Sequence, residues 1–109
     1  MPFPTLKDDG QTVTLDLHGA SVDEAEGLAL RAVAEARRRG RSSVRLIHGS
    51  STTGGSRRTI KETLHELLRE GRLGVSSANS HVGEDTLLIS LGHAGRHDPR
   101  ILTMTDLLR

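Results

Sequence analysis

The stretch Leu15–Gly19, which reads LDLHG, ends a segment in which apolar and polar residues alternate. In a β-strand, successive side chains lie on opposite faces. Three apolar side chains therefore share one face, which can pack against helices: Val13, Leu15 and Leu17. Asp16 and His18 share the other face and lie side by side at the carboxyl end of the strand, just before a glycine turn. We expect any chemistry of this chain at that point.

Periodicity and capping signals predict two long helices. Ser21 and Glu24 have the spacing of a capping box, and apolar residues recur at helical spacing over Val22–Arg39. Gly40 is the residue type that ends helices in a left-handed conformation. A second apolar stripe predicts a helix over Ser56–Glu70.

Four strands accompany these helices in the order β-α-β-α-β-β. They are expected at Gln11–Leu17, Ser43–Ile47, Val75–Val82 and Thr86–Leu91. Strand–helix–strand connections imply parallel neighbours with right-handed crossovers, whereas the last two strands are joined by a short turn and are expected to be antiparallel. Because the first strand has one polar face, both helices are expected on the same side of the sheet. The predicted fold class is therefore α/β, a two-layer sandwich with a mixed four-stranded sheet.

Residues outside these elements predict a simple domain organisation. Residues 1–10 are expected to be a flexible leader, residues 11–92 the domain, and residues 93–109 a C-terminal extension. Within the extension, Asp98 and Pro99 have the pattern of an N-cap followed by proline at the first helical position. A helix this short must dock to be stable. It either covers the open face of the sheet or joins a second subunit, so a monomer and a homodimer both stay open.

Composition excludes several function classes. The chain has 109 residues, enough for one domain, and a formal net charge of +1, which does not identify nucleic acid as the partner. There is no cysteine, so disulfides and thiolate zinc sites are excluded. The single aromatic residue, Phe3, argues against recognition by stacking several bases. With no signal peptide or membrane-spanning run, a cytoplasmic location is expected and no membrane partner.

A cluster of arginines follows the first helix. It comprises Arg37, Arg38, Arg39 and Arg41. Cations near a helix C-terminus complement the helix dipole, so a solvated charged face is one interpretation. A phosphate-contacting patch is the other.

The ends of two strands resemble each other, because His18-Gly19 and His48-Gly49 each precede a helix. Parallel strands would bring both histidines to one edge of the sheet, the edge where open α/β sheets bind ligands. Helix N-termini at this edge attract anions. With Lys61 and His65, the basic residues at the start of the second helix are expected to flank a phosphate site, although a solvated face is the alternative. The expected phosphate-binding residues are Gly49, Ser50, Ser51, Thr52, Thr53, Gly54, Gly55, Arg57, Arg58 and Lys61.

Two interpretations of the strand end stay open. Asp16 either caps local N–H groups or orients His18 for proton transfer, with His48 as a second acid or base. Two histidines at one phosphate can cleave a phosphodiester without a metal, whereas a two-metal site needs several carboxylates. Glu84 and Asp85 lie in a turn whose position the sequence does not fix. The other histidines are expected to be surface or packing residues: His65, His81, His93 and His97.

The chain resembles the Smr (small MutS-related) domain family over roughly Thr12–Gly92. An LDxH motif is present at Leu15, Asp16, Leu17 and His18. An HGxG motif begins at His48 and Gly49, but Ser51 stands where its second glycine is expected. The resemblance implies a fold similar to the C-terminal domain of translation initiation factor three. It also implies nucleic-acid binding and, as in several members, DNA-nicking or RNA-endonuclease activity.

The sequence thus predicts a structure-selective endonuclease, a hydrolase that cleaves phosphodiester bonds in DNA or RNA. Its expected catalytic residues are Asp16, His18 and His48. The alternative is a non-catalytic module that binds nucleic acid or the ribosome through the same site. The resemblance implies ribosomes or repair proteins as further partners, and a divalent metal, Mg²⁺ or Mn²⁺, stays open as a cofactor.

Overall fold

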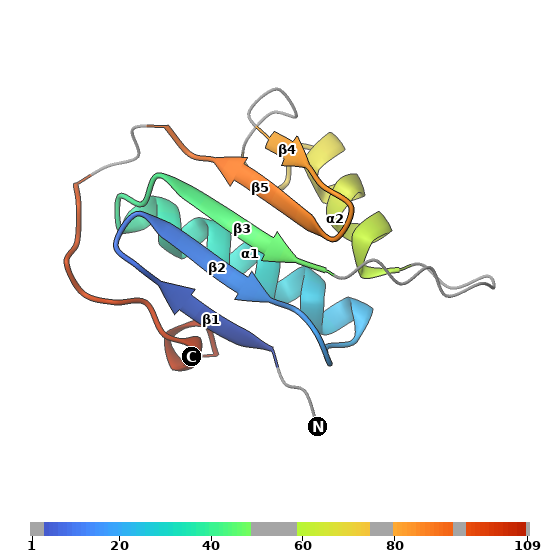
Figure 1. The fold of residues 1–109 in the computed structure, drawn as a ribbon, viewed down its shortest axis with the longest axis horizontal. Coiled ribbons are helices and arrows are strands. Elements are labelled where there is room, and N and C mark those ends of the chain that lie inside the picture. The colour runs from blue at the N-terminus through green and yellow to red at the C-terminus, as the bar shows by residue number, and fades with distance from the viewer. Residues whose placement is uncertain (1–3, 49–58, 75–79, 93–95, 109) are drawn as a thin grey trace.

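The computed structural model describes residues 4–48, 59–74, 80–92 and 96–108. In these ranges, five strands form one mixed sheet in the order β1-β2-β3-β5-β4, together with three helices (Figure 1). The elements are β1 (Thr5–Asp8), β2 (Thr12–Asp16), α1 (Val22–Arg38), β3 (Ser43–Ile47), α2 (Ile60–Arg69), β4 (Ser80–Val82), β5 (Thr86–Ser90) and α3 (Met104–Leu107).

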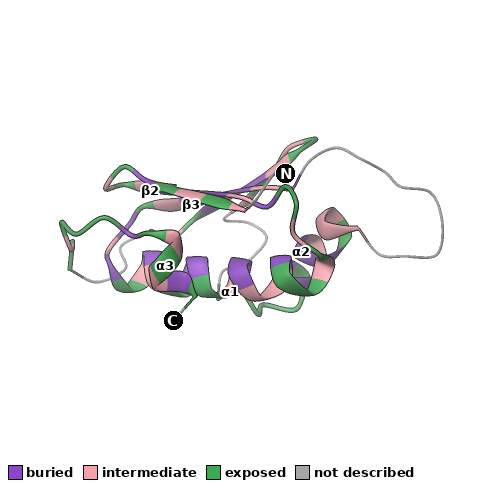
Figure 2. Cartoon of the chain, turned by 90° about the horizontal axis from the view of Figure 1, so that it is seen from below, coloured by how far each residue is buried: buried purple, intermediate pink, exposed green. Residues whose placement is uncertain are grey.

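The pairing of β2 with β3 follows the sequence prediction. The second crossover was predicted wrongly, because β5 lies between β3 and β4 and these two strands are not neighbours. β2 and β3 are parallel, with Asp16 opposite Ile47, whereas β5 is antiparallel to both β3 and β4. Viewed along the sheet, α1, α2 and α3 all lie on one side of it (Figure 2). The other side, called here the open face, carries none of the described helices. The prediction of an α/β fold with both long helices on one side of a mixed sheet is confirmed.

The number of strands was predicted wrongly. Thr5–Asp8 is not a flexible segment but β1, which pairs antiparallel with β2 and places Leu6 opposite Leu15. The sheet therefore has five strands rather than four. The sequence TLKD carries only one apolar residue, and its second inward-facing residue, Asp8, is stabilised by a contact distant in sequence.

The two long helices begin at capping residues. The Ser21 hydroxyl accepts a hydrogen bond from the Glu24 N–H, and the Glu24 carboxylate accepts one from the Ser21 N–H, so the predicted capping box is confirmed. α2 begins at Ile60, later than predicted, because the Thr59 hydroxyl caps it by accepting from the Glu62 N–H. Thr59 and Glu62 repeat the spacing of Ser21 and Glu24. This N-cap spacing marks the start of α2 in the sequence, whereas the prediction relied on the apolar stripe.

The core lies between the sheet and the helices. β2, β3 and β5 contribute alternate apolar residues that are fully buried, and the helices contribute their apolar stripes. The core strand residues are Val13, Leu15, Leu17, Val44, Leu46, Leu87 and Ile89. No helix of the described part of the chain is long and apolar enough to span a bilayer.

The C-terminal segment docks, but not as predicted. α3 begins after Thr103, whose side chain caps it with Asp106, so the helix expected to start at Asp98 is wrong. The Asp98 carboxylate instead accepts hydrogen bonds from Arg100. Leu102 and Leu107 are buried, and α3 packs beside α1 on the helical side (Figure 2). α3 therefore leaves the open face of the sheet uncovered.

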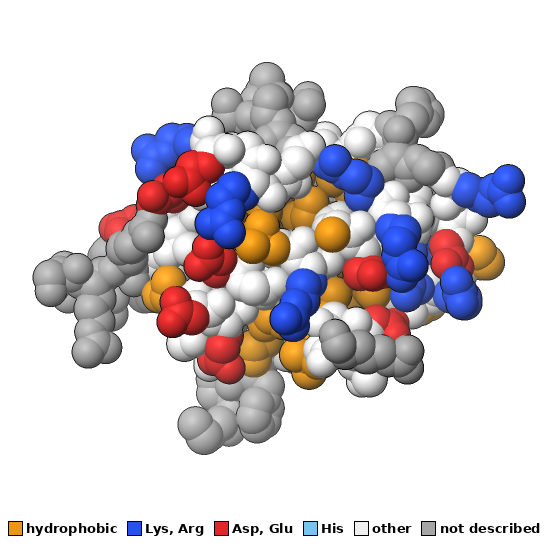
Figure 3. All heavy atoms as spheres, turned by 180° about the vertical axis from the view of Figure 1, so that it is seen from behind, with side chains coloured by type: hydrophobic (Ala, Val, Ile, Leu, Met, Phe, Trp, Pro, Cys, Tyr) orange, Lys and Arg blue, Asp and Glu red, His pale blue; other side chains and the backbone are white. Residues whose placement is uncertain are grey.

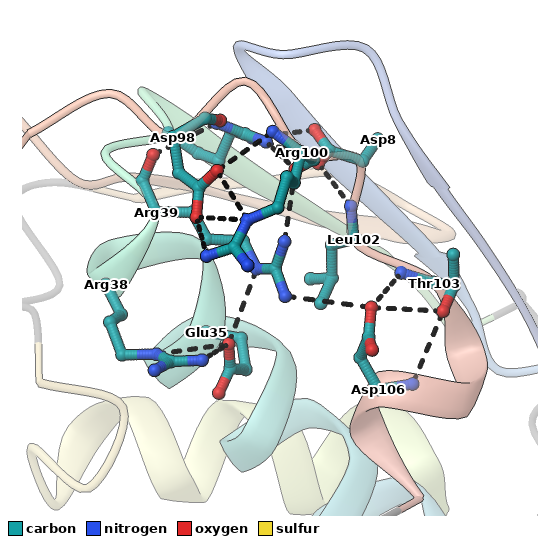
Figure 4. Close-up of polar contacts among 10 residues, drawn as sticks. Asp8, Glu35, Arg38, Arg39, Asp98, Arg100, Leu102, Thr103 and Asp106 are labelled. Carbon is teal, nitrogen blue, oxygen red and sulfur yellow. Dashed lines mark hydrogen bonds and ion pairs between the residues drawn. The ribbon is translucent and has the colours of Figure 1, made fainter.

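A buried ion pair joins Asp8 of β1 to Arg41, which lies between α1 and β3, and further hydrogen bonds of both residues reach the C-terminal segment (Figure 4). The Arg41 Nε and Nη2 atoms donate to the two carboxylate oxygens of Asp8, each at 2.8 Å. The remaining N–H groups of Arg41 donate to the backbone oxygens of Arg39, Asp98 and Arg100. The Asp8 carboxylate also accepts from the N–H of Leu102. All five donors of the guanidinium are thus satisfied.

These contacts set the ionisation of Asp8 and correct the prediction for the arginine cluster. Burial alone would raise the pKa of Asp8, but hydrogen bonds from Arg41 and from the backbone N–H of Leu102 lower it below its ordinary value of 3.8. Arg41 is fully buried, and Arg39 bonds the Arg100 backbone oxygen and pairs with Asp106. Neither forms part of a solvated face or an exposed phosphate patch.

Candidate active site

The parallel pairing of β2 and β3 brings the two predicted histidines to one edge of the sheet. The Leu17 N–H donates to the Ile47 oxygen at 2.9 Å, which extends the pairing to the ends of both strands. The next residues along the two chains are His18 and His48. In Figure 1, the arrowheads of β2 and β3 point to this edge, which we call the carboxyl edge. The N-termini of α1 and α2 lie toward the same end.

Asp16 and His18 form a hydrogen-bonded pair at this edge. The Nδ1 atom of His18 lies 2.5 Å from Asp16 Oδ1, and the same oxygen accepts the His18 backbone N–H at 3.0 Å. Gly19 then takes a φ of 86°, which the following turn into α1 requires and which L-residues rarely adopt. The turn sets the backbone direction at His18. It thereby holds the ring of His18 against Asp16, which is only two positions earlier in the chain.

The geometry of this pair directs one ring nitrogen of His18 to solvent. A carboxylate can only accept hydrogen bonds, so Asp16 favours the tautomer of His18 with a proton on Nδ1. Nε2 then carries the lone pair. The side chain of His18 is 54% exposed and that of Asp16 is 35% exposed. The pair is therefore accessible, and it is equipped to take a proton at Nε2 from a bound molecule.

His48 reaches the same edge but lies on the other face of the sheet. It continues the inward series of Val44 and Leu46, and it is only 7% exposed. Its N–H donates to the Asp85 oxygen at 2.9 Å, and its ring packs edge-on against that of His65, with centroids 6.0 Å apart. The shared edge is confirmed. Direct contact between His48 and a substrate stays a prediction.

His65 of α2 is a packing residue, as predicted, but its neighbour is a predicted catalytic residue. Burial lowers the pKa of His65 below its ordinary value of 6.5, and the charges of His48, Lys61 and Arg69 lower it further. His65 is therefore held in the neutral form beside His48. His65 lies beside the buried stripe of α2, and its contact with His48 depends on how α2 docks.

Most of the predicted phosphate-binding residues lie outside the described part of the chain, which omits 49–58. They are Gly49, Ser50, Ser51, Thr52, Thr53, Gly54, Gly55, Arg57 and Arg58. Lys61 is half-buried in the first turn of α2. Because α2 begins at Ile60, Arg57 and Arg58 precede this helix in the sequence and do not belong to it as predicted.

The turn between β4 and β5 is a neighbour of the site that the sequence did not place. The bond from His48 to the Asp85 oxygen brings this turn, with Glu84 and Asp85, to the carboxyl edge. In the described ranges, no group of three or more histidine or carboxylate side chains is arranged to hold a metal ion. The position of this turn follows from the antiparallel pairing of β3 with β5. That pairing could be inferred only with knowledge of the strand order.

Comparison with known proteins gives one match. A family model for the Smr domain matches residues 15–91, which is most of the chain and includes the strand end, the two histidines and the last two strands. Searches of curated proteins and of solved structures returned no significant match.

Proposed function

The chain belongs to the Smr domain family, a nucleic-acid-binding and nuclease-type domain, and from that premise we propose that it is a structure-selective endonuclease. The observation that carries the proposal is the Asp16–His18 pair, an accessible proton-transfer group at the edge of the sheet where both crossover helices begin. The substrate class is the phosphodiester backbone of DNA or RNA.

In the proposed reaction, His18 moves the proton and Asp16 positions it. Nε2 of His18 takes a proton from the attacking oxygen, which is water on DNA or the 2′-hydroxyl on RNA. The new bond forms at phosphorus while the bond to the leaving oxygen breaks, and a second acid protonates that oxygen. The Asp16 carboxylate stabilises the imidazolium that forms on His18, because both of its short contacts are to this residue.

His48 is proposed to assist the cleavage reaction from the helix-facing side of the carboxyl edge. Its N–H holds the β4–β5 turn through Asp85, and its ring lies against the neutral His65. The residues from Gly49 to Gly55, together with Arg57, Arg58 and Lys61, are proposed to hold the phosphate backbone. Few contacts of this kind read base edges, so cleavage is expected to depend on nucleic-acid structure rather than on sequence.

A second candidate function is a module that binds nucleic acid or the ribosome at the same edge without cleaving. Ser51, in place of the second glycine of the HGxG motif, favours this alternative, because a side chain at that position changes how closely the loop backbone approaches a phosphate.

A cleavage assay separates the two functions. Purified protein is incubated with supercoiled plasmid and with a structured RNA, each with and without EDTA. We expect product from at least one substrate, and loss of about 100-fold or more of the rate in His18→Ala, the size of a typical general acid–base contribution. Cleavage of RNA alone that survives EDTA supports the histidine mechanism, whereas loss of cleavage in EDTA indicates a metal near Asp16.

The matched control is His97→Ala, an exposed histidine at the opposite end of the molecule, where it contacts the Gly10 oxygen. This variant should cleave at the wild-type rate. Binding without product by the wild-type protein would overturn the endonuclease proposal and favour the binding module. Equal cleavage by His18→Ala would show that the Asp16–His18 pair is not the catalytic group.

A further inference from the structure

A row of residues that includes two cations, Lys7 and Arg45, crosses the open face of the sheet. Strand pairing places five residues directly across from one another, one on each strand: Lys7, Thr14, Arg45, Leu88 and His81. Lys7, Arg45 and His81 are exposed. Their neighbours in sequence, such as Asp8 and Leu46, face the helices and are buried. The row therefore points away from the helical layer.

These cations are not used to hold the fold together. Among the described residues, Lys7 and Arg45 form no ion pair, whereas Arg38 and Arg72 of the helical side pair with Glu35 and Glu26. The five strands contain two acidic residues. Asp8 faces the helices and is bound by Arg41, and Asp16 is bound by His18. Among the described strand residues, the open face therefore carries two fixed positive charges, those of Lys7 and Arg45, and one carboxylate, that of Asp16.

The row lies next to the proposed catalytic pair. Thr14 is in the row, and Asp16 follows two positions later on the same face of β2, so the row is about 7 Å from Asp16 along the strand. Lys7 and Arg45 lie on the two strands that flank β2, about 10 Å apart across the sheet. They therefore lie on either side of β2, the strand that ends at Asp16 and leads into His18.

The helical side is less suited to a polyanion. Its surface, seen from behind in Figure 3, has acidic and basic side chains interspersed. The first turns of α1 and α2, which approach the carboxyl edge, carry Asp23, Glu24 and Glu62. A phosphate backbone that leaves the site toward the helices meets these carboxylates. One that leaves toward the open face meets Lys7 and Arg45.

We propose that the open face binds the sugar–phosphate backbone of a nucleic-acid duplex and guides it to Asp16 and His18. This inference rests on the proposed function and adds the path of the substrate. Lys7 and Arg45 contact phosphates on either side of β2, and hydroxyls such as that of Thr86 add hydrogen bonds. A duplex is favoured over a single strand, because its bases stack on one another and the chain offers no set of aromatic rings to replace that stacking.

The test is a binding titration with labelled DNA duplex, RNA duplex and single strands of the same sequence, at several salt concentrations. All proteins carry His18→Ala, so that substrate stays intact. We expect Lys7→Ala with Arg45→Ala to weaken duplex binding by on the order of 10-fold or more, and to reduce the slope of log affinity against log salt by about 2.

The matched control removes the same charge from the helical side, with Arg38→Ala and Arg69→Ala, both of which are exposed side chains. This double variant should bind duplex nearly as the parent does, and circular dichroism should show both double variants folded.

Equal losses in the two double variants, or no loss in the Lys7 and Arg45 variant, would overturn the path across the open face. Equal affinity for single strands would overturn the assignment to a duplex. No binding of any nucleic acid by the parent or by the wild-type protein would instead overturn the proposed function itself.

Discussion

A carboxylate lies at each end of the β1–β2 hairpin, and each is paired with the side chain of an arginine or a histidine. The two pairs differ in burial. Asp8 and Arg41 are both fully buried, with a shortest contact of 2.8 Å. Asp16 and His18 are both accessible, with a contact of 2.5 Å. The first pair faces the helices and bonds three backbone oxygens of neighbouring segments. The second lies on the open face and bonds no other described segment of the chain.

Burial therefore separates a structural pair from a candidate catalytic one. Removing one member of a buried pair leaves the other charge without a partner in a medium of low polarity, which is strongly unfavourable. An exposed pair contributes little to stability. The fold therefore depends on the Asp8–Arg41 pair. It depends little on the Asp16–His18 pair, whose residues can serve in catalysis.

The largest expected effect breaks the buried pair. Asp8→Ala should lower the free energy of unfolding by about 3–5 kcal/mol, because Arg41 loses its counter-charge and the Leu102 N–H loses its acceptor. Urea denaturation measures this change, which is a large part of the ~5–15 kcal/mol that stabilises a typical domain.

The control for that measurement is the exposed pair of the same segment, Arg100 and Asp98. Arg100→Ala should change the free energy of unfolding by less than about 1 kcal/mol, because its side chain is 81% exposed while its backbone oxygen, which Arg41 bonds, is unchanged. Equal losses in Asp8→Ala and Arg100→Ala would show that burial does not distinguish these pairs.

A smaller effect concerns the stability of the fold below neutral pH, through His65, which packs against His48. The pKa of His65 is lowered in the folded state, so the unfolded chain takes up a proton first as the pH falls below about 6.5. Stability that is intact above this pH should therefore be lost progressively below it. His65→Gln should reduce this loss between pH 7 and 5, measured by thermal unfolding. A wild-type pH profile in His65→Gln would show that His65 is not held neutral by the fold.

The sequence predicted the parts of the fold that rest on local signals. Alternation at β2, the capping box of Ser21 and Glu24, and the two crossovers were enough to place both long helices on one side of a mixed sheet. β1 and the start of α3 were predicted wrongly, because their placement depends on contacts between distant residues. Asp8 and Arg41 are 33 positions apart, and Asp8 and Leu102 are 94 apart.

The same division holds for the candidate site. Asp16 ends β2 and His18 follows two residues later, so their proximity follows from their closeness in sequence. The shared edge of His18 and His48 follows from the parallel pairing. The contact between His48 and His65, and the arrival of Asp85 at the carboxyl edge, depend on the docking of α2 and β5. No sequence pattern within a single segment predicts how α2 and β5 dock.

The most direct test makes one chemical change at each end of the hairpin and measures both stability and cleavage. Asp8→Asn should lower the urea midpoint markedly, while the protein that remains folded cleaves at close to the wild-type rate. Asp16→Asn should leave the free energy of unfolding within about 0.5 kcal/mol of wild type and lose about 100-fold or more of the cleavage rate. Cleavage by Asp16→Asn at the wild-type rate, or an equal loss of stability in the two variants, would contradict the account.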